Sequence, residues 1–181
     1  MPEIQIRPTV ASDLPRLMGL DHSISSEAVW QLELRREAGQ TTAVFREVRL
    51  PRSISIAYPR NPFSLADDWA KRSMMYTALP VGADPAGYIS LVERGMDSLV
   101  YVTDLVVNIA NRRQGIGSAL LSAAHEWSAG RGQRRVIFET QSKNVPAIRL
   151  AQKFGYEFCG YNDQHYLTQD VTLFFCKSVK I

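Results

Sequence analysis

The segment Arg112–Ser118 constrains this chain more than any other. It follows the apolar run Leu99–Val107 and precedes a stretch with apolar residues at helical spacing, so it predicts a strand, a glycine-containing turn and a helix. The first N–H groups of a helix lack partners within the helix and carry partial positive charge. Gly115 and Gly117 lack the Cβ atoms that would keep an anion away from those donors. The segment therefore predicts a phosphate or pyrophosphate site, with an ordinary basic turn as the alternative.

Basic residues gather around this segment. The chain has a net charge of +3, yet residues 112–153 contain eight lysines and arginines against two acidic residues, Glu126 and Glu139. A basic half beside a mildly acidic half suits a polyanionic cofactor and a cationic acceptor. The alternative for each of these charges is a solvated helix face. The chain has no run of basic residues with interleaved aromatics, which argues against binding of nucleic acid.

Composition limits the class of protein. At 181 residues, with 45% hydrophobic and 22% charged residues, the chain suits one globular domain. No apolar run reaches the roughly 20 residues of a membrane span, and the first residues form no secretory signal. Cys159 and Cys176 lack the spacing of a structural zinc site, so no metal is expected. Reduced thiols in a cytoplasmic protein that does not bind membranes are the simplest interpretation.

Hydrophobic periodicity predicts an α/β chain. The first half is expected to hold the following elements: a strand at 3–9, a short helix after Ser12-Asp13, a hairpin pairing 30–35 with 44–50, an irregular segment at 51–66, and strands Met74–Leu79 and Gly87–Glu93. A short strand at Ser53–Ala57 is the alternative within the irregular segment. A helix over 28–36 is the alternative to the first hairpin strand. The second half is expected to continue with these elements: strand Leu99–Val107, helix Gln114–Ala129, strand Arg134–Thr140, a helix capped by Asn144 and ended by Gly155, and strands Tyr156–Tyr161 and Val171–Val179. Alternating strands and helices predict largely parallel pairing in this half.

Two familiar phosphate-binding motifs do not fit the spacing. A P-loop requires Lys followed by Ser or Thr after its last glycine, whereas Gly117 is followed by Ser118 and Ala119. A dinucleotide fingerprint requires GxGxxG, and its third glycine position is Leu120 here.

The pattern Arg/Gln-x-x-Gly-x-Gly after a strand ending in Val107, together with Asn144-x-x-Ala147 and Phe154-Gly155-Tyr156, resembles the GCN5-related N-acetyltransferase family. The resemblance covers roughly residues 85–161. It implies a single α/β (α+β) domain over 1–181, with helices flanking a mixed central sheet whose strands splay apart. Residues 1–98 would form the acceptor side, 99–161 the acetyl-CoA-binding core, and 162–181 a C-terminal loop and strand.

In that family the turn's N–H groups hold the pyrophosphate of acetyl-CoA, and the strand end at Val107 pairs with the pantetheine arm. The residues that the resemblance implies for binding this co-substrate are Val107, Arg112, Arg113, Gln114, Gly115, Gly117, Ser118 and Asn144. Dimers are frequent among relatives, so the resemblance leaves a homodimer open.

A narrower likeness points to an acceptor. The stretch 139–147, the segment Leu20–Ser23 and the tail from Gly160 to Tyr166 are similar to streptothricin acetyltransferases, which acetylate an amine of a cationic antibiotic. The implied function is direct transfer of acetyl from acetyl-CoA to a primary amine of a small cationic substrate in a ternary complex. The alternatives are acetylation of a peptide N-terminus or lysine, and a non-catalytic acyl-CoA-binding sensor or partner module.

Acetyl transfer to an amine requires a base for the amine's proton, donors for the oxyanion and an acid for the leaving thiolate. The resemblance places the Val107 N–H beside the thioester carbonyl. Glu139, near the end of its strand, is the first candidate for the base, with a structural carboxylate paired to Arg134 or Arg135 as the alternative. Asp104 is the second candidate. Because it lies inside a strand, we expect it to have a partner, either structural or in the substrate.

The family's usual acid is missing. Many members have a tyrosine in the second helix where this chain has Ala151. Tyr166 is the first substitute, followed by Tyr161 and His165. The alternatives are that Tyr166 only packs in its loop, or that the thiolate leaves without an acid.

Overall fold

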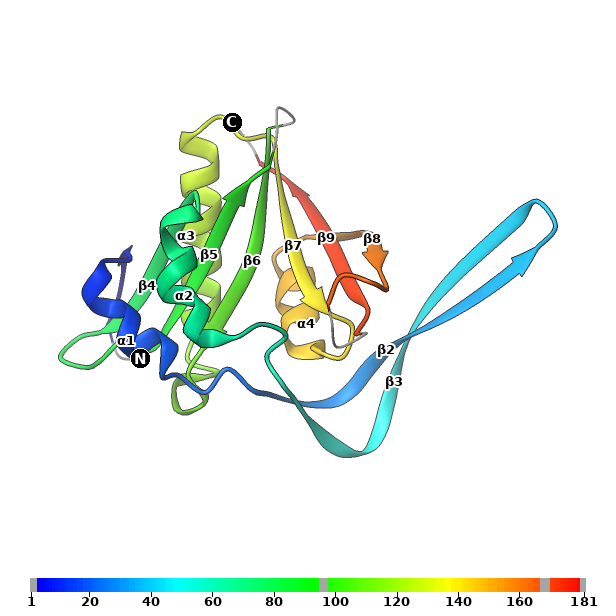
Figure 1. Ribbon diagram of the computed structural model, residues 1–181, viewed down its shortest axis with the longest axis horizontal. Helices are drawn as coiled ribbons and strands as arrows, with labels where there is room; N and C mark the ends of the chain where they lie inside the picture. The colour runs from blue at the N-terminus through cyan, green and yellow to red at the C-terminus, as the bar shows by residue number, and fades with distance from the viewer. Residues whose placement is uncertain (1–2, 95–97, 167–169, 180–181) are drawn as a thin grey trace.

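The computed structural model describes residues 3–94, 98–166 and 170–179, which form a mixed sheet, a long separate hairpin and four α-helices (Figure 1). The sheet order is β1-β4-β5-β6-β7-β9-β8. Its strands are β1 (Ile4–Pro8), β4 (Met74–Pro80), β5 (Gly87–Glu93), β6 (Leu99–Val107), β7 (Arg135–Gln141), β8 (Glu157–Asn162) and β9 (Thr172–Ser178). The hairpin is β2 (Ile24–Glu37) with β3 (Gln40–Ile56), and the helices are α1 (Leu14–Met18), α2 (Leu65–Asp68), α3 (Ile116–Gly130) and α4 (Val145–Lys153). Short 3₁₀ turns occur at Ala11–Asp13, Pro62–Ser64, Trp69–Lys71 and Ile109–Asn111.

Helices cover both faces of the main sheet. Leu120 of α3 and Ile148 of α4 are fully buried in one apolar cluster together with Ile89 of β5. Leu17 of α1 lies in a second cluster with Tyr88, the neighbour of Ile89. Since successive side chains of a strand point to opposite faces, α3 and α4 lie on one face and α1 and α2 on the other. The apolar spacing predicted α1, α3 and α4 correctly, whereas α2 was not predicted.

Strand pairing in the second half differs from the prediction. In the described residues only β6 and β7 pair in parallel; β9 pairs antiparallel with both β7 and β8. The expectation of largely parallel pairing is therefore wrong. After α4 the chain runs to the outer edge as β8, and β9 returns to fill the place beside β7. A sequence pattern gives the order of strands along the chain, but not this insertion.

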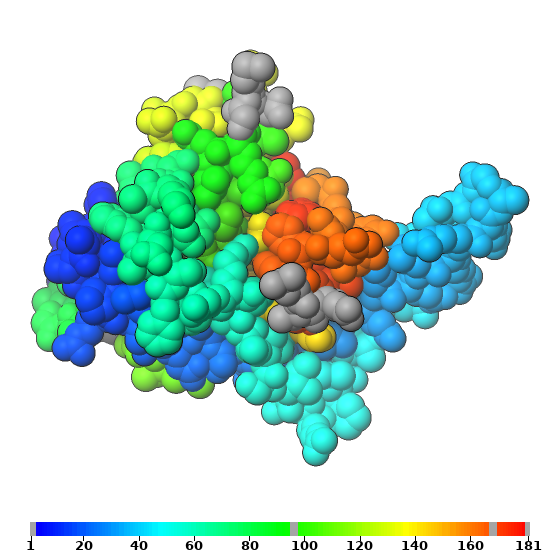
Figure 2. All heavy atoms as spheres, in the orientation of Figure 1, coloured from blue at the N-terminus to red at the C-terminus, as the bar shows by residue number. Residues whose placement is uncertain are grey.

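The hairpin is confirmed and is longer than predicted, and the alternative helix over 28–36 is wrong. β3 continues through Pro51 to Ile56. Between the pairs Ser26↔Ile54 and Ala28↔Arg49 the register shifts, and the extra residues, which include Pro51, bulge out of β3. Trp30 anchors the hairpin, with its backbone N–H donating to Ser142 O at 2.8 Å. Its ring also packs against aromatic side chains: Phe45, Phe158 and Phe175. The far end of the hairpin extends away from the body of the molecule (Figures 1 and 2).

A gap opens between the two central strands. The parallel pairing of β6 with β7 runs from Leu99↔Arg135 only to Val102↔Phe138, although β6 continues to Val107. Figure 1 shows the two strands diverging beyond this point. The sheet therefore has the splay that the sequence resemblance implied, and Asp104 and Glu139 lie where it begins.

Gly87 of β5 is required by the close approach of β6. A Cβ built at this position would lie 2.4 Å from the backbone oxygen of Val106. We expect Gly87→Ala to lower the free energy of unfolding by about 2 kcal/mol, because the backbone of β6 must shift. Urea denaturation measures this. Gly160→Ala is the control, since no atom lies within 4 Å of its built Cβ. Equal stability of the two variants would contradict the prediction.

Candidate active site

The three candidate catalytic residues meet at the gap between β6 and β7. Asp104 lies on β6 and Glu139 on β7, and their side chains are 1% and 0% exposed. Tyr166 Oη donates a hydrogen bond to Glu139 Oε1 at 2.8 Å. The structure thus brings the candidate base and the candidate acid into direct contact, although 27 positions separate them in the chain.

Arg60 joins the two carboxylates. Its Nη1 donates to Asp104 Oδ1 at 2.9 Å and to the Thr103 carbonyl at 2.9 Å. Its Nη2 donates to Glu139 Oε1 at 2.5 Å. The guanidinium also lies 5.4 Å from the centroid of the Tyr166 ring. We call Arg60, Asp104, Glu139 and Tyr166 the carboxylate cluster. The partner of Glu139 is thus neither Arg134 nor Arg135 but a residue of the irregular segment after β3, which no sequence motif indicated.

The two oxygens of Glu139 differ in their surroundings. Oε1 accepts from Arg60 and Tyr166 and lies 3.1 Å from His165 Nε2. Oε2 is buried and has no hydrogen-bond partner among the residues that the structure describes. A buried carboxylate oxygen of this kind has lone pairs that no donor uses. Glu139 therefore still has an oxygen that can accept a proton or an N–H donor.

Asp104 is held by several donors, as its position inside a strand predicted. Tyr58 Oη donates to Oδ1, and Thr103 Oγ1 donates to Oδ2 at 3.0 Å. A second cation, Arg72, lies 3.6 Å from Oδ2. Asp104 thus has more partners than Glu139, and they indicate a structural anchor for the cluster.

Tyr166, and Tyr58 beside Asp104, remain protonated. Burial raises the pKa of Tyr166, and the negative charge of Glu139 raises that pKa further, against the opposing effect of Arg60. Burial and the neighbouring Asp104 raise the pKa of Tyr58 in the same way. The Tyr166 phenol therefore carries its proton at neutral pH.

The predicted anion site lies at the start of α3. Gly115 has φ +86° and Arg113 φ +65°, the left-handed region that costs a residue with a side chain about 1 kcal/mol. Within the described residues, no side chain caps the N-terminus of α3, and its first turn contains no acidic residue. The N–H groups of this turn thus have no side-chain competitor for an anion. The turn fits the pyrophosphate of a coenzyme A group.

Two further backbone features point to the same gap. A Cβ at Gly117 would lie 3.4 Å from Leu150 Cδ2 and 3.9 Å from Val107 Cγ2, so the glycine keeps a space between α3, α4 and the end of β6. Asn108 N donates to Ala86 O at 2.8 Å across β5. Because hydrogen-bonded and non-bonded pairs alternate in an antiparallel ladder, the Val107 N–H points away from β5, toward β7.

Several predicted cofactor-binding side chains have internal partners. Arg112 donates from Nε to the Val107 carbonyl at 2.8 Å and from Nη2 to the Ser23 carbonyl at 2.7 Å. Asn144 Oδ1 accepts from Ala147 N at 3.2 Å and caps α4, as predicted. Gln114 donates to a backbone carbonyl of the same turn, whereas Ser118 lies in the first turn of α3. These contacts shape the backbone around the turn, and a direct role in binding acetyl-CoA stays a prediction.

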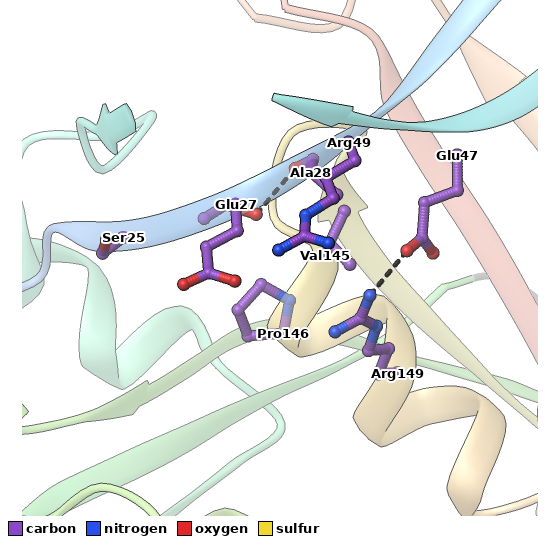
Figure 3. Close-up of a pocket in the computed structure, with 9 residues that line it drawn as sticks. Ser25, Glu27, Ala28, Glu47, Arg49, Val145, Pro146 and Arg149 are labelled. Atoms are coloured by element: carbon purple, nitrogen blue, oxygen red, sulfur yellow. Dashed lines mark hydrogen bonds and ion pairs between the residues drawn. The ribbon is translucent and has the colours of Figure 1, made fainter. Parts of the chain in front are cut away.

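A separate groove lies between β2 and the start of α4 (Figure 3). It measures about 420 Å³, and Glu47 and Arg149 form an ion pair on it at 2.5 Å. The residues that line it are Ser25, Ser26, Glu27, Ala28, Glu47, Arg49, Val145, Pro146 and Arg149. None of the candidate catalytic side chains is among them, so the groove is not where those side chains meet.

Comparison with known families identifies the class of this site. The sequence model of the Acetyltransferase (GNAT) family matches residues 42–156, which include the turn at the start of α3 and both carboxylates. The chain belongs to this family. It is an acetyl-CoA-dependent N-acetyltransferase with a mixed, splayed sheet, as the sequence resemblance implied.

Individual relatives resemble this chain more closely in fold than in sequence. A streptothricin acetyltransferase of Streptomyces lavendulae is 24% identical over 166 residues, which cover 90% of this chain and 86% of that protein. One from Escherichia coli is 29% identical over 115 residues, covering 64% of this chain and 65% of that protein. The crystal structure of nourseothricin acetyltransferase matches with a TM-score of 0.81 and 22% identity, over 98% of this GNAT chain and 99% of that one.

A Bacillus anthracis protein crystallised with acetyl coenzyme A has the same fold, with a TM-score of 0.73 and 21% identity, over 97% of this chain and 99% of that one. Among the described residues of the GNAT chain, no helix is long and apolar enough to cross a membrane.

Proposed function

We propose that this enzyme acetylates a primary amine of a small cationic antibiotic of the streptothricin type. The observation that carries the proposal is the pair of buried carboxylates, Asp104 and Glu139, on opposite sides of the gap. Buried carboxylates need positive partners, so this site favours a cationic acceptor over a neutral one. The names of the two relatives from Streptomyces lavendulae and Escherichia coli agree with this acceptor class.

We assign a role to each group at the gap. Acetyl-CoA, held at the turn that precedes α3, supplies the acyl group as a thioester. The Val107 N–H, directed toward β7, donates to the oxygen on which negative charge develops. Glu139 binds the acceptor's ammonium group and takes its proton at Oε2, the oxygen without a partner. Tyr166 then supplies a proton to the leaving thiolate, and Asp104 keeps Arg60 and Tyr58 in place.

An assay of thiol release with acetyl-CoA tests the function. We expect release of coenzyme A with streptothricin and with small diamines, and none with forms in which every amine is acetylated. A peptide acetyltransferase would instead respond to peptides with a free N-terminus or lysine. A sensor would bind coenzyme A in calorimetry and release no thiol with any amine. Either result would overturn the proposal.

The role of Tyr166 has its own test. We expect Tyr166→Phe to lower kcat about 100-fold, because the buried phenol is the proton donor next to Glu139. The dissociation constant of coenzyme A should stay within about twofold, since this loop is not part of the turn that binds the pyrophosphate. Tyr161→Phe is the matched control, as Tyr161 packs edge-on against Phe45 of the hairpin. Near-normal turnover of Tyr166→Phe, or a larger loss with Tyr161→Phe, would exclude Tyr166 as the acid.

A further inference from the structure

Arg60 lies at the gap to which the proposed function assigns the acceptor's ammonium group. Its guanidinium lies between the two strands that splay apart, and it donates to one carboxylate on each. The segment that carries it lies beside the residues that follow β8, on the face shown in Figure 2. No step of the proposed acetyl transfer uses Arg60, so its position needs another explanation.

Arg60 balances the charge of the two buried carboxylates together with Arg72. Asp104 and Glu139 supply two negative charges, and Arg60 and Arg72 supply two positive ones within 3.6 Å. An ammonium group that entered beside Arg60 would leave an excess positive charge in a buried site, which is costly. If Arg60 left and nothing replaced it, Arg72 at Asp104 would be the one arginine still paired with the two carboxylates within the described part of the chain. Exchange of one cation for another avoids both costs.

Access to the carboxylates also depends on Arg60. The side chains of Asp104 and Glu139 are at most 1% exposed, whereas that of Arg60 is 26% exposed. The arginine therefore forms part of the outer wall, and its long side chain can swing into solvent without movement of a strand. Glu139 Oε2 is buried and has no hydrogen-bond partner among the residues that the structure describes.

We propose that Arg60 is a specificity-determining residue: its guanidinium occupies the place of the acceptor's ammonium group, and only a cation displaces it. A neutral acceptor cannot compensate the carboxylates that Arg60 leaves behind, so it is excluded. This inference rests on the proposed function, because it concerns the acceptor site of that reaction.

The same exchange explains how product leaves. Transfer forms a C–N bond, breaks the C–S bond and turns the ammonium group into a neutral amide. One of its protons passes through Glu139 to solvent, and a second ends on the coenzyme A sulfur as a thiol. The amide has lost the charge that allowed it to compete, so Arg60 returns to the two carboxylates and expels it.

Arg60→Met removes the charge and keeps the length of the side chain. We expect the KM for ethylamine to fall about tenfold, because the apparent affinity of the wild type is reduced by the fraction of sites that Arg60 occupies. Ethylammonium chloride should raise the melting temperature of Arg60→Met more than that of the wild type, relative to sodium chloride. Arg46→Met is the control, because Arg46 is 65% exposed on the hairpin and pairs with Glu33.

An unchanged or higher KM in Arg60→Met would overturn the inference, as it would show that Arg60 helps to bind or position the acceptor. If Arg60→Met does not fold, Arg60→Lys tests the inference instead. Lysine keeps the positive charge but lacks the two guanidinium nitrogens that bind both carboxylates at once. A KM below that of the wild type supports displacement, and an equal or higher KM refutes it. If neither the wild type nor any variant released thiol, the proposed function would be refuted. The inference about Arg60 would still be tested, because the ethylammonium-dependent shift in melting temperature does not depend on catalysis.

Discussion

Replacement of Glu139 by glutamine is expected to lower kcat/KM for a cationic amine about 1,000-fold. The substitution removes the oxygen that takes the acceptor's proton and the charge that holds its ammonium group. A positioned base contributes about 10²–10⁴-fold to the rate of a reaction. Glutamine has nearly the same shape, and its amide oxygen can still accept from Tyr166 at the position of Oε1. The variant therefore tests chemistry with little change in packing.

Steady-state kinetics across pH separate loss of the base from loss of structure. We expect Glu139→Gln to regain rate as pH rises, because a larger fraction of the amine is then already deprotonated in solution. Glu47→Gln is the matched control, since Glu47 also pairs with an arginine but lies on the groove beside α4. Should Asp104→Asn lose more activity than Glu139→Gln and show the same pH rescue, the roles of the two carboxylates would be exchanged.

Local patterns made much of this fold predictable. β6 begins and ends at the predicted residues, and α3 and α4 differ from their predicted bounds by a few residues. Each of these elements combines a regular apolar period with a local stop or start signal, such as Gly155 at φ +77° or the capping Asn144. The position of β9 between β7 and β8 was not predictable in this way, because it depends on which of the last two strands pairs with β7.

The candidate site was predictable only in part, for a related reason. Glu139, Asp104 and Tyr166 were named from the chemistry of acetyl transfer and a family resemblance, and the fold brings them together. Arg60 was missed because it lies in an irregular segment, 44 and 79 positions from the carboxylates that it binds. A sequence shows that Asp104 needs a partner but cannot show which of many arginines supplies it. The missed residue is the one that gives the site its charge balance.

Introduction of valine at Gly117 is expected to weaken binding of coenzyme A about 100-fold, or about 2.7 kcal/mol. The new methyl groups would enter the space between Leu150 and Val107, next to the N–H donors of the α3 turn. Calorimetry with purified protein measures the change. Gly117→Ala should stay within about threefold of the wild type, since its Cβ meets Leu150 Cδ2 at an ordinary contact distance of 3.4 Å.

Gly130→Val is the control that shows whether weaker binding of coenzyme A comes from blocking the gap or only from placing valine in α3. Gly130 ends the same helix, and no atom lies within 4 Å of its built Cβ, so a side chain there reaches open space. Both variants place a β-branched residue in α3, yet only Gly117→Val obstructs the gap at the end of β6. If the two bind coenzyme A equally well, the cofactor does not approach the start of α3. The gap beside Glu139 would then lack its acyl donor, and the roles assigned to Val107 and Tyr166 would fail with it.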